Sequence, residues 1–108
     1  MIFQEKINQI KTTALFNKWV INLKDASARA MITKRIERAE RGNFGDHKSL
    51  GEGLFEMRIT VGAGYRLYYG QIGNTVYLLL LGGNKATQTK DIAKAKEIWH
   101  FVKTSMRG

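Results

Sequence analysis

The chain has no cysteine and no proline among its 108 residues. The absence of cysteine excludes a disulfide framework, a thiol nucleophile and a thiolate metal site. The absence of proline excludes a proline-rich linker, and no low-complexity tract or internal repeat divides the chain. We therefore expect a single domain over residues 1–108, a length at which one domain is usual.

Histidine is also scarce. His47 and His100 are the two histidines, and neither has a second ligand nearby at metal-binding spacing. Motifs of a phosphate-binding P-loop, a zinc protease or a serine hydrolase are missing as well. We expect no metal and no cofactor, and catalysis by a histidine acid or base is not supported.

Long apolar runs are missing too. No run approaches the roughly 18 residues that a membrane span needs. The opening residues, MIFQEKINQIK, do not have the pattern of a signal peptide. Together with the lack of cysteine, this predicts a cytoplasmic protein with no membrane partner.

Positive charge is what the chain has in excess. Eighteen lysines and arginines against nine acidic residues give a formal net charge of +9. Such a balance in a small domain indicates a polyanionic partner, such as nucleic acid, a membrane surface or an acidic protein. The alternative is a protein that is basic without such a partner. A hydrophobic fraction of 44% is enough for a core, which argues against disorder.

The first half of the chain is expected to be mainly helical. Residues 2–7 alternate well enough for a short strand. Apolar residues at spacings of three and four predict a helix over 13–23, and Asp25 is placed to cap a second helix over 27–41 that Gly42 ends. Because the connection is short, the two helices should form an antiparallel hairpin. The inner side of the second helix is expected to carry Ala28, Ile32, Ile36 or Arg35, and Ala39.

The second half changes to the alternation of β-strands. Residues 54–60 place Glu56 and Arg58 on one face. The apolar residues of the opposite face are Phe55, Met57 and Ile59. This segment therefore predicts a strand with one face toward the core.

Two turns continue this strand into a meander. The GAG turn leads into a strand over 65–72, and Gly73-Asn74 leads into a strand over 75–83 that should be covered on both faces. Thr87 or Thr89 then caps a C-terminal helix. The inner side of that helix is expected to carry Ile92, Ala95, Trp99 and Val102. The order predicts an α+β fold with an N-terminal strand, a helical hairpin, a three-stranded antiparallel meander and a C-terminal helix.

Three cations fall on or beside these strands. Arg58 points away from the apolar face, Arg66 lies on the paired strand, and Lys85 comes just after the next strand. In a meander the three side chains come from neighbouring strands, and they could line one concave surface. The alternative for each is a solvated cation on a strand.

This combination of residues suits RNA cleavage. Attack by the RNA 2′-OH develops negative charge on the non-bridging oxygens and on the leaving 5′-oxygen, which fixed guanidinium and ammonium groups stabilise. Tyrosines provide surfaces on which unpaired bases stack. By strand alternation Arg66 and Tyr68 share an exposed face, which makes Tyr68 the candidate for contact with RNA. The general base stays open between Glu56 and a tyrosine.

A second basic surface is expected on the second helix. Lys34, Arg38 and Arg41 share one helical face and could bind RNA phosphates. Glu37 and Glu40 interrupt this surface, so a solvated helix face is the alternative.

Four parts of the chain together carry a family resemblance. They are Trp19 with Leu23, RIERAERGNFGDHKSLGEG over 35–53, FEMRI with GYRLYY within 55–69, and LLLLGGNKATQTKDIAKA over 78–95. With these residues, nearly the whole chain resembles the RelE/ParE superfamily of bacterial toxins, and within it the HigB-like addiction module killer proteins.

The resemblance implies a RelE-like fold and a function. It implies the toxin of a type II toxin–antitoxin system, a cytoplasmic bacterial protein that cleaves mRNA on the ribosome. A cognate antitoxin, typically a small helix-turn-helix protein, would neutralise it. Members related to ParE inhibit DNA gyrase instead, so a gyrase inhibitor or a non-catalytic nucleic-acid-binding protein is the alternative.

The resemblance also assigns roles to residues. Arg66 matches a transition-state arginine and Lys85 a second catalytic cation, while Arg58 matches a lysine of the preceding strand. Glu56 falls where RelE-type toxins have a lysine that transfers a proton; it is either the base or a partner that orients Arg58 or Arg66. A substrate-stacking tyrosine of those toxins falls near Asp91. Further substrate-binding candidates within the matching segments are Lys48, Gln88 and Lys90.

Overall fold

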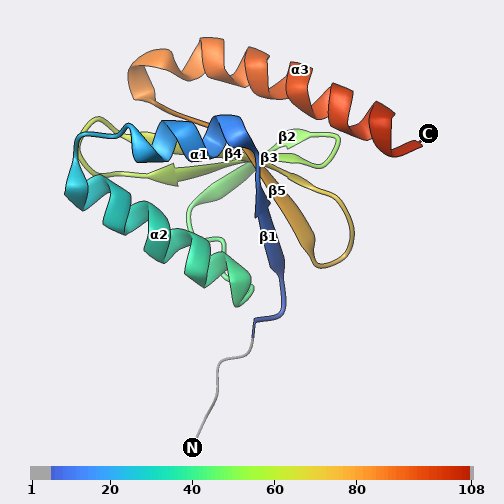
Figure 1. Ribbon diagram of the computed structural model, residues 1–108, viewed down its shortest axis with the longest axis horizontal. Helices are drawn as coiled ribbons and strands as arrows, with labels where there is room; N and C mark the ends of the chain where they lie inside the picture. The colour runs from blue at the N-terminus through green and yellow to red at the C-terminus, as the bar shows by residue number, and fades with distance from the viewer. Residues whose placement is uncertain (1–5, 108) are drawn as a thin grey trace, which may run out of the picture.

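The structure, a computed structural model, describes residues 6–107. A five-stranded sheet forms the middle layer, with helices α1 (Ala14–Ile21) and α2 (Ala26–Glu40) on one face and α3 (Gln88–Arg107) on the other (Figure 1). The predicted α+β class with a C-terminal helix is confirmed. The two N-terminal helices cover the same face, and the chain reverses direction between them in Figure 1.

The sheet has the strand order β1-β5-β4-β3-β2. The strands are β1 (Gln9–Thr12), β2 (His47–Gly51), β3 (Leu54–Ile59), β4 (Tyr65–Gln71) and β5 (Val76–Asn84). The antiparallel meander of β3, β4 and β5 confirms the prediction. β2, which pairs antiparallel with β3, was not predicted, and β1 joins β5 in parallel, so the sheet is mixed.

The N-terminal strand begins later than its predicted range of 2–7. Residues 2–5 lie outside the described residues, and Lys6 and Ile7 are not in a strand. The backbone N–H groups of Ile7 and Asn8 both donate to the carbonyl of Glu40, each at 2.9 Å. This stretch is therefore bonded to the end of α2, and sheet pairing starts only with β1, whose first residue donates to Thr75.

The predicted cap and end of the second helix are confirmed, whereas the first helix, predicted over 13–23, is shorter and covers Ala14–Ile21. The Thr13 hydroxyl accepts from the backbone N–H of Phe16, and the Asp25 carboxylate accepts from Ala28, which satisfies N–H groups that the helix itself leaves unpaired. Gly42 follows α2 with φ +93°, a conformation that glycine adopts without strain.

The cap predicted for the last helix was wrong. The cap residue is Asn84 rather than Thr87 or Thr89. Asn84 caps a short 3₁₀ turn, η1 (Lys85–Thr87), which continues directly into α3. The Asn84 side chain accepts from the N–H groups of Ala86 and Thr87 at 2.9 and 3.2 Å. The turn places Lys85 immediately before the helix.

Strand alternation divides the core into two clusters. On the α1/α2 side, Met57 and Leu67 pack with residues of both helices, and on the α3 side Tyr68 and Leu80 pack with Trp99. The predicted inner residues of α3 are confirmed, since Ala95 and Trp99 are buried and Ile92 and Val102 pack against them. β5 contributes to both clusters, as expected for a strand covered on both faces.

Two glycines let tryptophans lie flat against the sheet. A Cβ at Gly70 would lie 2.2 Å from the ring of Trp99, and a Cβ at Gly82 would lie 2.2 Å from the ring of Trp19. The Trp99 indole also donates to the carbonyl of Glu52 at 2.8 Å, which ties α3 to the β2–β3 turn. The packing of α1 and α3 against the two faces of the sheet thus depends on the absence of a side chain at Gly82 and Gly70.

We predict that Gly70→Ala lowers the free energy of unfolding by about 1–3 kcal/mol, because the added methyl group displaces Trp99. Gly73→Ala is the matched control, since no described atom lies within 4 Å of its added Cβ. It should change stability by less than about 0.5 kcal/mol. Urea unfolding measures both, and equal losses would contradict the packing argument.

Candidate functional site

The three predicted cations lie together. Arg58, Arg66 and Lys85 line a cleft of about 330 Å³ beside the turn between β3 and β4. The other lining residues are Ile59, Thr60, Gly62, Ala63, Gly64 and Tyr65. The backbone N–H of Lys85 lies 3.4 Å from the carbonyl of Ala63, so η1 is bonded to that turn. The prediction that neighbouring strands bring these cations to one surface is confirmed.

Strand register sets two arginines next to each other. Arg58 and Arg66 are directly opposite each other on β3 and β4, so their side chains leave the same face of the sheet. Like charges in that position repel. Each has an acidic partner: Arg58 Nη2 lies 2.9 Å from Asp46 Oδ1, and Arg66 Nε lies 3.9 Å from Glu56 Oε2. Such paired cations suit a multivalent anion that can contact both.

Arg66 is more enclosed than its strand position predicted. Its side chain is 13% exposed, and its Nη1 donates to the carbonyl of Gly64 at 2.9 Å. Gly64 has φ +75°, and a Cβ there would lie 3.5 Å from that same nitrogen and 3.4 Å from the Lys85 Cβ. Arg66 was predicted on an exposed face of its strand, and its side chain is instead mostly enclosed. Glycine suits position 64 because of its positive φ.

Glu56 is fully buried and is not among the residues that line the cleft. Its Oε2 accepts a hydrogen bond of 2.8 Å from Gln88 Nε2, at the first residue of α3. Of the two roles expected for Glu56, this geometry fits a partner of Arg66 better than a general base. A general base must reach the proton that it removes from the substrate, and a fully buried carboxylate outside the cleft does not. Gln88 was expected to bind substrate, whereas in the structure its side chain binds this carboxylate.

Tyr68 was expected to touch RNA, and that prediction was wrong. It lies directly opposite Glu56 in the sheet and is completely buried under α3. Its hydroxyl has no hydrogen-bond partner among the described residues. Burial raises the pKa of Tyr68, and the charge of Glu56 raises it further. Alternation identified the face of the strand correctly, but α3 covers that face.

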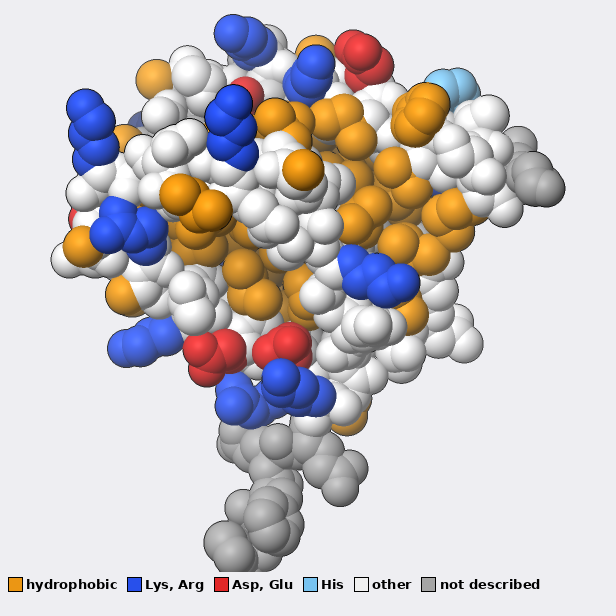
Figure 2. Space-filling view, in the orientation of Figure 1, with side chains coloured by type: hydrophobic (Ala, Val, Ile, Leu, Met, Phe, Trp, Pro, Cys, Tyr) orange, Lys and Arg blue, Asp and Glu red, His pale blue; other side chains and the backbone are white. Residues whose placement is uncertain are grey.

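The other predicted substrate-binding residues lie outside the cleft lining. Lys48 is exposed on β2 opposite Glu56, and Lys90 is exposed in the first turn of α3. Three exposed cations lie in the layer on the other side of the sheet: Lys34 and Arg38 on α2, and Arg41 at its C-cap. On the face seen in Figure 2, lysines and arginines are spread out rather than gathered in one patch. The cleft thus differs from the rest of the basic surface because three cations converge on one hollow, not because positive charge is found only there.

Arg35 is the structural residue that the sequence left ambiguous. It is buried and donates to the carbonyls of Arg58, Phe44 and Asp46 at 2.7, 2.9 and 3.3 Å. Burial, with the nearby charge of Arg38, lowers its pKa. Arg35 thereby holds the loop before β2 against β3, which places Asp46 beside Arg58. In the sequence, the sign of this role was the position of Arg35 on the predicted inner side of the second helix.

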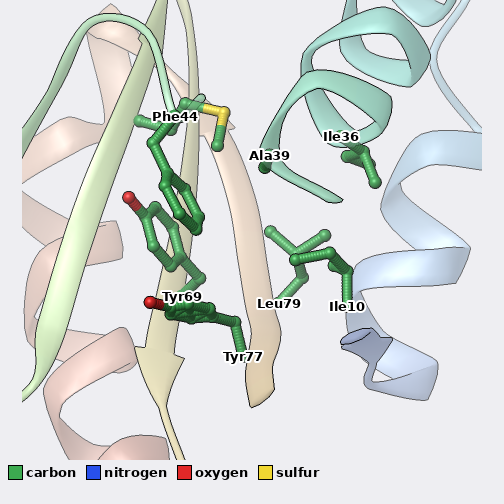
Figure 3. Close-up of a pocket in the computed structure, with 8 residues that line it drawn as sticks. Ile10, Ile36, Ala39, Phe44, Tyr69, Tyr77 and Leu79 are labelled. Carbon is green, nitrogen blue, oxygen red and sulfur yellow. The ribbon is translucent and has the colours of Figure 1, made fainter. Parts of the chain in front are cut away.

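A second hollow lies between α2 and the sheet, around Phe44, Tyr69 and Tyr77 (Figure 3). The rings of Phe44 and Tyr69 stack with centroids 5.3 Å apart, and Tyr77 meets Phe44 edge-on at 4.8 Å. The free space is only about 10 Å³, hardly enough for one water molecule. This hollow is part of the core packing, not a ligand site.

Comparison with known proteins gives one informative relative. No family model matches the chain, and no solved structure matches it. An uncharacterized protein of Haemophilus influenzae is 50% identical over 88 residues, which are 82% of this chain and 89% of that protein. The chain belongs to the same family as this Haemophilus influenzae protein.

Among residues 6–107, no three acidic or histidine side chains come close enough to hold a metal ion. No helix in this part of the chain has the length and hydrophobicity to cross a membrane.

We predict that alkaline pH destabilises the fold through its buried phenols. Burial raises the pKa of Tyr68 and Tyr69 above the ordinary value of 10.0. Above pH 10 the unfolded chain loses protons that the native protein keeps, so the free energy of unfolding falls as pH rises, by up to about 1.4 kcal/mol per pH unit for each phenol. Urea unfolding between about pH 9 and 11 measures this slope. The double variant Tyr68→Phe/Tyr69→Phe should flatten it, and an unchanged slope would contradict the assignment.

We also predict that Arg35→Ala lowers the free energy of unfolding by roughly 2–4 kcal/mol, because three carbonyl groups lose a charged donor. Arg38→Ala, on the exposed side of the same helix, is the matched control and should change it by less than about 0.5 kcal/mol. Thermal unfolding of both variants provides the comparison. A similar loss in the two would mean that Arg35 contributes only its charge.

Proposed function

We propose that this protein is the toxin of a bacterial type II toxin–antitoxin system, a cytoplasmic endonuclease that cleaves mRNA on the ribosome. The main support is the cleft in which Arg58, Arg66 and Lys85 meet. The toxin assignment and the cognate antitoxin rest on the resemblance of the four sequence segments to HigB-like proteins. A net charge of +9 is consistent with an RNA substrate.

The cleft fits a phosphodiester group in particular. A guanidinium group offers a planar pair of donors that matches two phosphate oxygens, and two such groups lie on adjacent strands. Lys85 adds a compact charge on the other side of the turn. Because Arg66 is held by neighbouring groups, it can stabilise developing charge with little reorganisation.

The proposed reaction is transesterification within the RNA. The 2′-oxygen forms a bond to the adjacent phosphorus while the bond from phosphorus to the 5′-oxygen breaks, leaving a 2′,3′-cyclic phosphate and a 5′-hydroxyl. Arg66 stabilises the charge on the non-bridging oxygens, and the exposed ammonium of Lys85 donates a proton to the 5′-oxygen. Solvent water accepts the 2′-proton in this proposal, because Glu56 is buried and its Oε2 is bonded to Gln88. Tyr65, a tyrosine that lines the cleft, is the alternative acceptor.

The remaining cations are assigned to RNA binding away from the scissile bond. Lys48 is exposed on β2, the strand next to that of Arg58, and Lys90 is exposed near the start of α3, which follows Lys85 in the chain. The basic face of α2 lies on the other layer and would contact RNA at a separate place. Each phosphate contact that is lost should reduce the salt dependence of binding by close to one unit.

We predict that Arg66→Ala lowers the kcat of mRNA cleavage on programmed ribosomes by about 100- to 1,000-fold, since one fixed donor to the developing charge is lost. Arg66→Lys keeps the charge but loses the planar fork, and it should recover only part of the activity. Lys85→Ala should also be impaired. Its matched control is Lys11→Ala, an exposed lysine on the β1 edge of the sheet.

Other outcomes would identify other functions. Full growth arrest by Arg66→Ala would refute the proposed site. Inhibition of gyrase supercoiling by wild-type protein, without mRNA cleavage, would identify a ParE-type inhibitor. RNA binding with neither activity would identify a non-catalytic protein. Rapid cleavage of ribosome-free RNA would show that the cleavage does not depend on the ribosome.

A further inference from the structure

A buried carboxylate links the cleft to the beginning of α3. Glu56 is 0% exposed, and it lies between Arg66 on β4 and Gln88 at the start of the helix. A buried charge is costly unless it is paired and hydrogen-bonded, and an apolar side chain at this position would fill the same space without that cost. Stability alone therefore does not account for a carboxylate here.

The contacts of Arg66 fix its orientation at two points. Its Nε lies 3.9 Å from Glu56 Oε2, an ion-pair distance at which no hydrogen bond is formed, and its Nη1 donates to the Gly64 carbonyl at 2.9 Å. Neither contact uses Nη2. Nε and Nη1 lie on opposite edges of the planar guanidinium group, so contacts at both atoms restrict how the group is oriented in the cleft.

The two arginines differ in how firmly they are held. Arg58 pairs with Asp46 at the surface, where the two side chains are 38% and 50% exposed. Arg66 and Glu56 are 13% and 0% exposed. Exposed ion pairs are weak and rearrange easily, whereas an enclosed pair is screened little by solvent. Arg66 is thus the more enclosed cation of the cleft and Arg58 the more exposed one.

Gln88 connects this pair to the position of Lys85. η1 begins with Lys85, and the backbone N–H of Gln88 donates to the Lys85 carbonyl. The side chain of Gln88 then donates to Glu56 at 2.8 Å. The short turn η1 therefore joins Lys85, a cation of the cleft, to Gln88, the donor that binds the carboxylate paired with Arg66.

We propose that Glu56 and Gln88 are positioning residues for Arg66: Gln88 fixes the Glu56 carboxylate, and that carboxylate fixes the guanidinium toward the cleft. The geometric part concerns the free protein. The catalytic consequence rests on the proposed function. Gln88 accordingly acts through Glu56 and does not bind substrate.

Nuclear magnetic resonance tests the geometric part without any substrate. In the ¹⁵N-labelled protein, the Nε–H of Arg66, identified by its loss in Arg66→Lys, should exchange with water at least about tenfold more slowly than that of exposed Arg38. Glu56→Gln and Gln88→Ala should each accelerate this exchange. Thr89→Ala, at the exposed neighbouring position, is the control and should not.

Kinetics on programmed ribosomes tests the catalytic part. Each of Glu56→Gln and Gln88→Ala should lower kcat by about ten- to a hundredfold with KM nearly unchanged, because Arg66 is misplaced while substrate contacts remain. The double variant should be no worse than Glu56→Gln alone, since both changes release the same group. A rise in KM for Gln88→Ala would make Gln88 a substrate contact and would overturn its assigned role.

The outcomes separate this inference from the proposed function. If Arg66 exchange is unchanged in the folded variants, the positioning inference is wrong, whatever the protein does to RNA. If exchange accelerates but the wild-type protein does not cut mRNA, the positioning holds and the proposed function fails. Gln88→Ala alters a half-buried side chain on a helix, so it keeps the test available if Glu56→Gln does not fold.

Discussion

The pairing register of β3 with β4 is the constraint on which the rest of the structure depends. It sets Arg58 against Arg66 and Glu56 against Tyr68 on the α3 side. A shift of one residue would exchange the two faces and place these groups in the apolar core under α1 and α2. The same register that builds two separate cores therefore also gathers the charged groups at one end of the sheet.

Close packing of α3 follows from this division. Trp99 lies against Gly70, and its indole holds the β2–β3 turn through Glu52. The opposite end of the helix holds Glu56 through Gln88. The helix is thus attached to the core by apolar contacts of Trp99 and to Glu56 by the Gln88 hydrogen bond. These two attachments position the first residue of α3 near Arg66, the ion-pair partner of Glu56.

Sequence patterns predicted what depends on local chemistry. The cap at Asp25, the meander and the gathering of Arg58, Arg66 and Lys85 all follow from spacing and turn residues. β2 was missed because HKSLG is mostly exposed and lacks a clear alternation. β1 was misplaced because its parallel pairing with β5 joins distant segments, which no local pattern reveals.

The burial of Tyr68 shows why the site was harder to predict than the fold. Alternation states which residues share a face, but exposure depends on what covers that face, here a helix twenty residues later in the chain. The covering helix also brings Gln88 to Glu56, a contact between residues 32 positions apart. The Glu56 carboxylate, which the sequence offers as base or as partner, thereby loses access to solvent and lies in contact with Gln88 and Arg66.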